Sequence, residues 1–345
     1  MKLKNIIKMG WGAFGANVWK RRVPLNVVLS VTNRCTSRCS YCNIPNRRQE
    51  ELTTDEILSL IDQITEMGCQ RLGLWGGEPL IRDDIAQIVD YAKEKDLFVT
   101  LDSNGYLLPQ RMRALSKLDH LILALDGPQE SHDLNKEPGS FQKVMAAIEA
   151  VTGRIAFWTI TVLTKNNLDS IDFILNKARE YGFLATFQVL HHNDVLARNQ
   201  EALLPSPESY RKAIEKLIIE KKKGAPIASS LNYLYHILSW SDYKTTAYSH
   251  ELNYLRCWAG KLYCNVDTDG SIYPCSLLVE KVKSLNFLDV GFKKAFDSLT
   301  FDSCKACLAS CFTEYNYLYS LDIGTIIEWL KAMRKTKKYL CKKIS

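Results

Sequence analysis

Between residues 25 and 223, short apolar runs alternate with segments in which apolar residues recur every three or four positions. Short apolar runs bounded by turn residues predict strands, and recurrence with a helical period predicts amphipathic helices. The predicted strands are 25–31, 71–75, 97–102, 120–125, 156–163 and 185–190, and the predicted helices are 54–67, 82–95, 109–118, 140–152, 168–181 and 207–223. Six successive strand–helix units indicate an α/β fold, either a partial (β/α)6 TIM-like barrel or a doubly wound sheet.

Candidate functional residues follow the predicted strands. Cys35, Gly76, Ser103, Asp126 and His191 each come just after one of them. Both α/β folds bind ligands at the carboxyl ends of parallel strands, so these residues should meet at one edge of the sheet.

The pattern changes outside this region, and five segments are expected. They are a basic amphipathic N-terminal segment 1–23, the α/β core 24–223, a helical connector 224–256, a small cysteine-rich domain 257–315 and a basic C-terminal tail 316–345. The cysteine-rich segment is short and rich in turn residues, so we expect it to need metal to fold.

The net charge of +7 is concentrated at the ends of the chain. Residues 1–22 carry six Lys or Arg and residues 331–345 carry seven, with no acid in either segment. The N-terminal segment 1–23 and the C-terminal tail 316–345 also contain Trp and aliphatic residues, a combination typical of peripheral attachment to a membrane lipid surface or of surface helices packed on the core. The rest of the chain is not basic, so no nucleic-acid partner is expected.

Nine of the eleven cysteines fall into three groups. The chain has neither an apolar run long enough to span a membrane nor a signal-peptide pattern, so we expect a cytoplasmic protein, where cysteines bind metal more often than they form disulfides. The first group, Cys35, Cys39 and Cys42, has the spacing C-x3-C-x2-C. Three thiolates on one loop suit a [4Fe–4S] cluster with one open iron, whereas zinc needs a fourth ligand and a redox dithiol leaves Cys35 unexplained.

This loop resembles the signature of the radical S-adenosylmethionine (SAM) superfamily, CxxxCxφC, with Tyr41 as the aromatic residue. The resemblance extends to a GGEP segment, to Asp102-Ser103-Asn104-Gly105 and to Leu125-Asp126-Gly127, where Ala124 replaces the usual serine. It implies a SAM-binding site and cleavage of SAM to a 5′-deoxyadenosyl radical, with electrons from a low-potential donor such as ferredoxin or flavodoxin. The cofactor-binding residues it implies are Tyr41, Gly76, Gly77, Glu78, Pro79, Ser103, Asn104, Asp126, Asn167 and Gln188. Asn167 is equally well explained as a helix N-cap.

The distal cysteines resemble the auxiliary-cluster region of SPASM and twitch radical SAM enzymes. Cys257-x12-Gly270-x4-Cys275 matches the SPASM pattern, but CxxCxxxC replaces its longer second half. The candidate ligands are Cys257, Cys264, Cys275, Cys304, Cys307 and Cys311. A twitch-type [4Fe–4S] cluster would use Cys257, Cys275, Cys304 and Cys307, whereas a SPASM-like one would use Cys257, Cys264, Cys275 and Cys311. Four thiolates would also suit structural zinc.

Three functional hypotheses follow. The first is a radical SAM oxidoreductase or bond-forming enzyme that acts on an unactivated C–H bond of a lipid or prenyl substrate at a membrane. The second is a peptide-modifying SPASM-type maturase, and the third is a zinc- or cluster-binding protein without catalysis. His191 and His192 are candidates to face the substrate, and no catalytic base is assigned.

Overall fold

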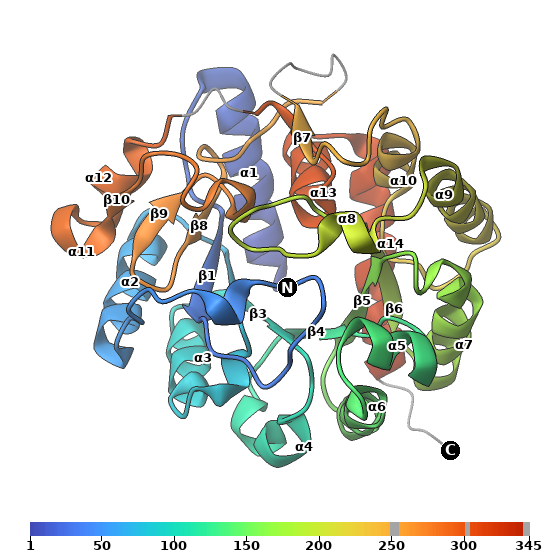
Figure 1. Cartoon of the computed structure of the whole chain (residues 1–345). Helices are drawn as coiled ribbons and strands as arrows, with labels where there is room; N and C mark the ends of the chain where they lie inside the picture. The colour runs from blue at the N-terminus through green and yellow to red at the C-terminus, as the bar shows by residue number, and fades with distance from the viewer. Residues whose placement is uncertain (249–254, 301–303, 341–345) are drawn as a thin grey trace.

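The computed structural model describes residues 1–248, 255–300 and 304–340, so the last five residues of the basic tail, with Lys342 and Lys343, lie outside the described part (Figure 1). A nine-stranded sheet has the order β10-β9-β8-β1-β2-β3-β4-β5-β6. Its strands are β1 (Asn26–Thr32), β2 (Arg71–Gly76), β3 (Phe98–Ser103), β4 (His120–Ala124), β5 (Phe157–Leu163), β6 (Leu184–Val189), β8 (Tyr263–Val266), β9 (Ser271–Tyr273) and β10 (Leu285–Asn286). Strands β1 to β6 are parallel and follow one another in chain order. A doubly wound sheet would reverse this order at a switch point, so the partial barrel is confirmed.

Helices connect the parallel strands and surround the sheet (Figure 1). They are α2 (Thr54–Glu66), α3 (Ile85–Glu94), α4 (Leu108–Arg111), α5 (Gln129–Asn135), α6 (Ser140–Val151), α7 (Ile171–Tyr181), α8 (Gln200–Leu203), α9 (Pro207–Lys222) and α10 (Leu231–Leu238). A capping box of Thr53 and Glu56 begins α2. These helices bury their apolar faces against the strands in one large core.

The prediction of one continuous α-helix over 109–118 is wrong. The structure has only the short α4, followed by a 3-10 turn at Met112–Leu115. The buried side chains Leu115 and Leu118 are three residues apart. Leu115 ends the 3-10 turn and Leu118 lies beyond it, so both side chains reach the core although the α-helix ends at Arg111.

The cysteine-rich segment continues the barrel's sheet. Strand β8 pairs in parallel with β1 at the free edge, and β9 and β10 extend the sheet in antiparallel fashion. The short helices α11 (Phe287–Val290) and α12 (Phe292–Asp297) follow, and β11 (Ala306–Cys307) pairs with β7 (Ala247–Tyr248) in a second small sheet. The distal cysteines are therefore attached to the same framework as the first cysteine loop.

The two basic segments of the chain are helical where the structure describes them. They form α1 (Leu3–Trp19) and, after α13 (Ser310–Tyr319), the long helix α14 (Ile323–Leu340). Helix α14 is fixed to the barrel by a hydrogen bond from Trp158 Nε1 to Thr336 Oγ1 of 2.7 Å. None of the described helices is long and apolar enough to cross a membrane.

Candidate active site

The loop after β1 brings Cys35, Cys39 and Cys42 together at the carboxyl end of the sheet. The Ser37 amide donates to Cys35 Sγ at 3.4 Å, and the Asn104 side chain reaches the same sulfur at 3.7 Å. Burial raises the pKa of Cys35 to about 12 and that of Cys42 to about 11, and the neighbouring thiols add to both shifts. With pKa values this high, Cys35 and Cys42 ionise at neutral pH only if positive charge joins them, which suits iron ligands.

The second strand ends in a loop that lies directly against this cysteine loop. A Cβ at Gly76 would lie 2.3 Å from the Thr32 carbonyl oxygen, and one at Gly77 would lie 2.1 Å from that of Arg34. Only glycine allows the two backbones to approach so closely, and φ at Gly76 is +133°. Pro79 then begins a single 3-10 turn.

Glu78 is fully buried and joins the ends of β2 and β3. Its carboxylate accepts hydrogen bonds from the Leu80 amide at 3.1 Å, the Asn104 amide at 2.8 Å and the Ser103 hydroxyl at 2.9 Å. Burial nevertheless raises the pKa of Glu78 to about 7, against the effect of these donors. The role of Glu78 at the SAM ammonium stays a prediction, and its observed contacts fix the two strand-end loops relative to each other.

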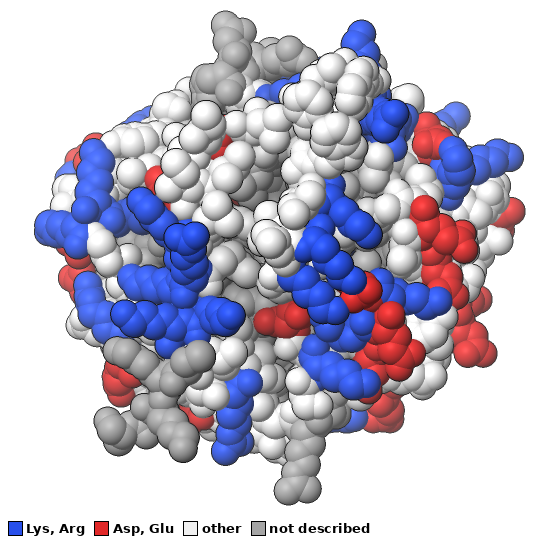
Figure 2. Space-filling view, turned by 180° about the vertical axis from the view of Figure 1, so that it is seen from behind, with Lys and Arg blue, Asp and Glu red and all other residues white. Residues whose placement is uncertain are grey.

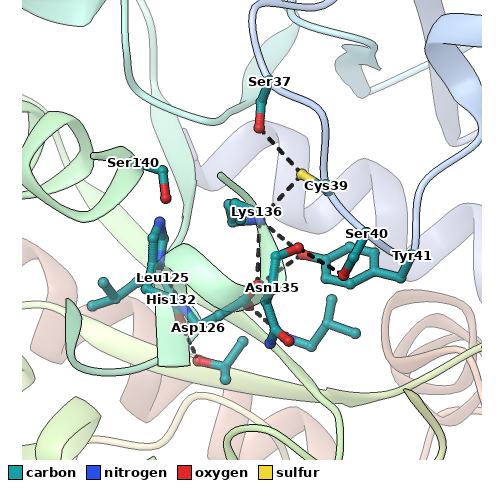
Figure 3. A network of polar contacts seen from close by, with 12 residues as sticks. Ser37, Cys39, Ser40, Tyr41, Leu125, Asp126, His132, Asn135, Lys136 and Ser140 are labelled. Atoms are coloured by element: carbon teal, nitrogen blue, oxygen red, sulfur yellow. Dashed lines mark hydrogen bonds and ion pairs between the residues drawn. The ribbon is translucent and has the colours of Figure 1, made fainter. Parts of the chain in front are cut away.

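A buried polar network occupies the end of β4 (Figure 3). The Tyr41 hydroxyl donates to Asp126 Oδ2 at 2.8 Å, and Lys136 Nζ donates to the Tyr41 oxygen at 2.7 Å. Lys136 also lies 3.3 Å from the Asp126 carboxylate and 3.5 Å from Cys39 Sγ. One buried cation therefore connects the cysteine loop with the two predicted site residues Tyr41 and Asp126.

Lys136 stays charged in this network although it is buried. Burial opposes the charge, but the charges of Asp126 and Cys39 outweigh it and raise the pKa of Lys136 well above its usual value. His132 lies behind the network and accepts a hydrogen bond from the Asp126 amide at its Nδ1. Burial lowers the pKa of His132 to about 4, so this imidazole is neutral.

Sequence reasoning missed Lys136 and His132, which lie in or just after the unpredicted helix α5. The segment shows no metal-ligand spacing, and its apolar positions do not form a clear helical pattern. The signal available was the lone Lys136 in a short stretch between two glycine turns directly after Asp126. Only the fold brings this cation to Cys39.

Asn167 and Gln188 use their side chains in contacts within the protein. Asn167 donates to the Asp126 and Val162 carbonyl oxygens and accepts from the Thr164 amide, and it makes no side-chain cap for the turn that follows. Gln188 accepts a hydrogen bond of 2.9 Å from Ser310 at the start of α13. Asn167 thus supports Asp126 from behind, and Gln188 connects β6 with the C-terminal helices.

The distal cysteines separate into two sets. Cys257, Cys275, Cys304 and Cys307 pack in one apolar cluster, and Cys257 interacts electrostatically with each of the other three. Cys264 belongs to the barrel core, where the thiol next to it is that of Cys69. This grouping is the twitch-type set, with Cys264 outside it.

Cys311 lies against the interior of the barrel, next to Asp102. Both residues retain accessible surface, yet desolvation by the surrounding protein raises the pKa of Asp102 to about 6 and that of Cys311 to about 12. Arg71, which donates to Thr100 Oγ1 at 2.9 Å, is the neighbouring cation of both. Asp102 faces the opposite side of β3 from Ser103, so it is a candidate to contact a substrate in the interior.

His191 and His192 follow β6 as predicted. Burial lowers the pKa of His191 to about 4, and it lowers that of His192 too, so both rings are neutral at pH 7. The Nε2 atom of each ring is buried without a hydrogen-bond partner among the described residues. Their contact with a substrate stays a prediction.

Both cysteine groups have the chemistry of iron–sulfur ligands, with mutual electrostatic interaction and little water. No three Cys, His, Asp or Glu side chains among residues 1–248, 255–300 and 304–340 lie close enough together to hold a single metal ion. A four-iron cluster spans a wider site than one ion, and three cysteines on one loop, beside the cation of Lys136, fit it. The fit of the distal group rests on the buried thiols of Cys275, Cys304 and Cys307 and on the partly buried Cys257 packed against them.

Comparison with known proteins matches residues 29–178 to the radical SAM superfamily. The chain is 28% identical over 277 residues to an AdoMet-dependent heme synthase of Methanosarcina barkeri, a match that covers 74% of this chain and 77% of that protein. It is also 28% identical over 276 residues to a PqqA peptide cyclase of Ruegeria pomeroyi, covering 76% and 70% of the two chains. The solved structure of anSMEcpe with bound AdoMet and Cp18Cys peptide superposes with a TM-score of 0.63 at 18% identity, over 92% of this chain and 96% of that one.

Proposed function

Because the chain belongs to the radical SAM superfamily, we propose that this radical SAM enzyme modifies a peptide, from which it removes a hydrogen atom at an unactivated C–H bond. The PqqA peptide cyclase among the relatives and the peptide-bound anSMEcpe structure support this substrate class. The relatives and structures reported above do not include an enzyme named for a lipid or prenyl substrate, which the basic segments had suggested. The peptide hypothesis therefore replaces it.

The observation that carries the proposal is the buried network that joins Cys39 to Tyr41, Asp126 and Lys136. In the proposed site, Cys35, Cys39 and Cys42 hold three irons, and the glycines after β2 let the loop that would bind the methionine part of SAM lie directly against the cysteine loop. When bound, the [4Fe–4S] cluster and SAM supply an electron and a 5′-deoxyadenosyl radical. Lys136 provides the cation for an anionic group placed beside Cys39, and Asp126 and Tyr41 keep that cation in position.

We propose further that Cys257, Cys275, Cys304 and Cys307 hold an auxiliary [4Fe–4S] cluster. Strand β8 connects this group directly to β1, which carries the first cysteine loop. An auxiliary cluster attached to the same sheet could take up the electron when the substrate radical is oxidised. A low-potential donor such as ferredoxin or flavodoxin would reduce the first cluster.

The test is anaerobic reconstitution of the full chain with iron and sulfide, followed by reduction in the presence of SAM. We expect release of 5′-deoxyadenosine, which should disappear when Cys35, Cys39 and Cys42 are replaced by Ala and persist in Cys69→Ala, a buried thiol away from both groups. Short peptides encoded beside the gene should raise this release and change in mass. An iron-loaded protein that releases no 5′-deoxyadenosine would contradict the proposal.

The distal ligand set is tested separately by iron content and by the spectrum of the second cluster. Cys304→Ala should lose about half of the bound iron, because one of two four-iron clusters no longer forms. Cys264→Ala and Cys311→Ala should keep all of it, because neither thiol belongs to the proposed set. Equal iron loss in Cys264→Ala would instead favour the SPASM-like set, and zinc in place of iron would show a structural site.

A further inference from the structure

Helix α1 exposes its bulky apolar side chains and buries its small and polar ones. The buried residues are Asn5, Ala13, Gly15 and Ala16. Ile7 and Trp11 are each 62% exposed and Trp19 is 51% exposed. A surface helix of a globular protein normally turns its apolar face to the core, and α1 does the reverse.

The exposed apolar residues form one continuous surface, which we call the α1 face. It consists of Leu3, Ile7, Trp11, Phe14, Val18 and Trp19, which are six of the thirteen large exposed hydrophobic residues in the described part of the chain. Residues 3, 7, 11, 14 and 18 follow the three- and four-residue spacing of one helical stripe. The rings of Trp11, Phe14 and Trp19 pack against one another, with centroids 5.6–6.0 Å apart.

Basic side chains border the α1 face. Lys8 and Lys20 belong to the helix and its end, and neither has an ion-pair partner among the described residues. Arg21 lies over the Trp19 ring at 5.2 Å. On the side of the molecule opposite to that of Figure 1, Lys and Arg lie on both sides of uncharged surface (Figure 2). Tryptophan beside aliphatic residues and lysines is the composition of helices that lie in the interface of anionic membranes.

A groove of about 480 Å³ runs between α1 and the loops before β2 and β3. Ile7 and Trp11 form apolar parts of its wall, and Lys8 and Arg21 supply positive charge. Lys4 and Lys95 also line it, but they are already paired with Asp96 and Asp62. An anionic headgroup would meet Lys8 and Arg21 there, with its acyl chains beside the α1 face.

The contacts of Asn5 show at which end of the barrel the α1 face lies. Asn5 donates to the Gln70 side chain and to the Asp96 carbonyl oxygen. Both residues precede strands, so α1 covers the amino ends of β2 and β3. The cysteine loop and Lys136 lie at the carboxyl ends, on the opposite side of the barrel.

We propose that the α1 face attaches the protein to the surface of a membrane that contains anionic lipid, with the active-site end directed away from the bilayer. Such attachment leaves the mouth of the barrel open to a peptide in solution. A second copy of the chain is a poorer partner for this face, because a symmetric contact would bring the same bases of both copies together. The proposal stands independently of the substrate class.

The test is flotation of the full-length protein with phosphatidylcholine vesicles that contain or lack phosphatidylserine. We expect binding to the anionic vesicles that weakens as salt is added and is much weaker without phosphatidylserine. Trp11→Ser with Trp19→Ser should weaken binding about tenfold or more, because the apolar anchor is removed. Lys8→Glu with Lys20→Glu should weaken it about tenfold and remove much of the salt dependence.

Ile219→Ser is the matched control, because Ile219 on α9 is 52% exposed but lies apart from the α1 face. It should bind vesicles like the wild type, and all variants should release 5′-deoxyadenosine at the wild-type rate. No binding to anionic vesicles, or equal loss in the Ile219 variant, would overturn the proposal. A soluble dimer that the tryptophan variant dissociates, without vesicle binding, would show that the face pairs with protein instead.

Discussion

The two ends of the parallel strands differ in which side chains they bury. At the carboxyl ends, Glu78, Asp126 and Lys136 are almost completely removed from water and each is held by several partners. At the amino ends, charged pairs such as Lys4–Asp96 remain in solvent beside the exposed α1 face. Buried charge and exposed apolar surface are both unfavourable for an isolated protein, so each end suggests a binding partner of its own.

This difference assigns the reaction to the carboxyl ends of the strands and attachment to a membrane to their amino ends. Buried, mutually compensating charges keep fixed positions, which suits a site that must hold a charged cofactor next to sulfur ligands. An apolar face bordered by exposed lysines needs no such precision, and it suits a fluid surface such as a bilayer. If both assignments hold, the membrane is not the source of the substrate.

The largest expected effect comes from breaking the buried pair at the carboxyl end. Lys136→Met should leave Asp126 uncompensated and destabilise the protein by about 3–5 kcal/mol, since an unpaired buried charge is costly. Release of 5′-deoxyadenosine should fall about 100-fold or more through loss of a fixed cation. Urea unfolding and single-turnover assays measure the two effects, and Lys136→Arg should recover part of both.

Lys4→Met is the matched change at the amino end. Lys4 and Asp96 form an ion pair of 2.6 Å, but their side chains are about half exposed, so water replaces the lost contact. Neither the unfolding midpoint nor the release of 5′-deoxyadenosine should change. Similar losses in the Lys136 and Lys4 variants would remove the contrast between the two ends.

The second prediction concerns pH, and it depends on Glu78. Its pKa rises from 4.5 to about 7 in the folded protein, so between these pH values the native state holds a proton that the unfolded state has lost. Glu78 therefore makes the free energy of unfolding fall by about 3 kcal/mol as the pH rises from 4.5 to above 7. Glu78→Gln lacks this dependence, so its stability relative to the wild type should rise over the same interval. Denaturant titrations of both proteins at several pH values measure this, and parallel curves would contradict it.

The sequence predicted the strand-end positions well because they depend on local patterns. The six strands and the loops that carry Cys35 and Gly76 all follow from apolar runs and turn residues nearby. Lys136 was not predicted, because its contact with Cys39 joins residues 97 positions apart. The pairing of β8 with β1, which brings the distal cysteines to the edge of the barrel, is equally non-local.

The orientation of α1 could not be predicted from the sequence for a different reason. Sequence reasoning identified an amphipathic basic segment, but composition alone could not show which face packs on the barrel. The buried face is set by small residues, since Ala13 and Ala16 allow close approach to the barrel where a bulky side chain would not fit. The bulky residues are left outside, and the location of the helix at the amino ends emerges only from its contacts with Gln70 and Asp96.

The smallest expected effect tests that orientation directly, through two glycines on α1. A Cβ at Gly10 would meet nothing within 4 Å, whereas one at Gly12 would lie 2.7 Å from the Leu25 side chain. Gly10→Ala should therefore stabilise the protein by about 0.5–1 kcal/mol, because alanine lowers the entropy cost of helix formation. Gly12→Ala has the same favourable helix propensity, but the new methyl group must displace the Leu25 side chain. The increase in stability should therefore be smaller than for Gly10→Ala, or the protein should be destabilised. Equal stabilisation by both changes would mean that this side of α1 does not pack against the barrel, and the α1 face would then have to be assigned to other residues.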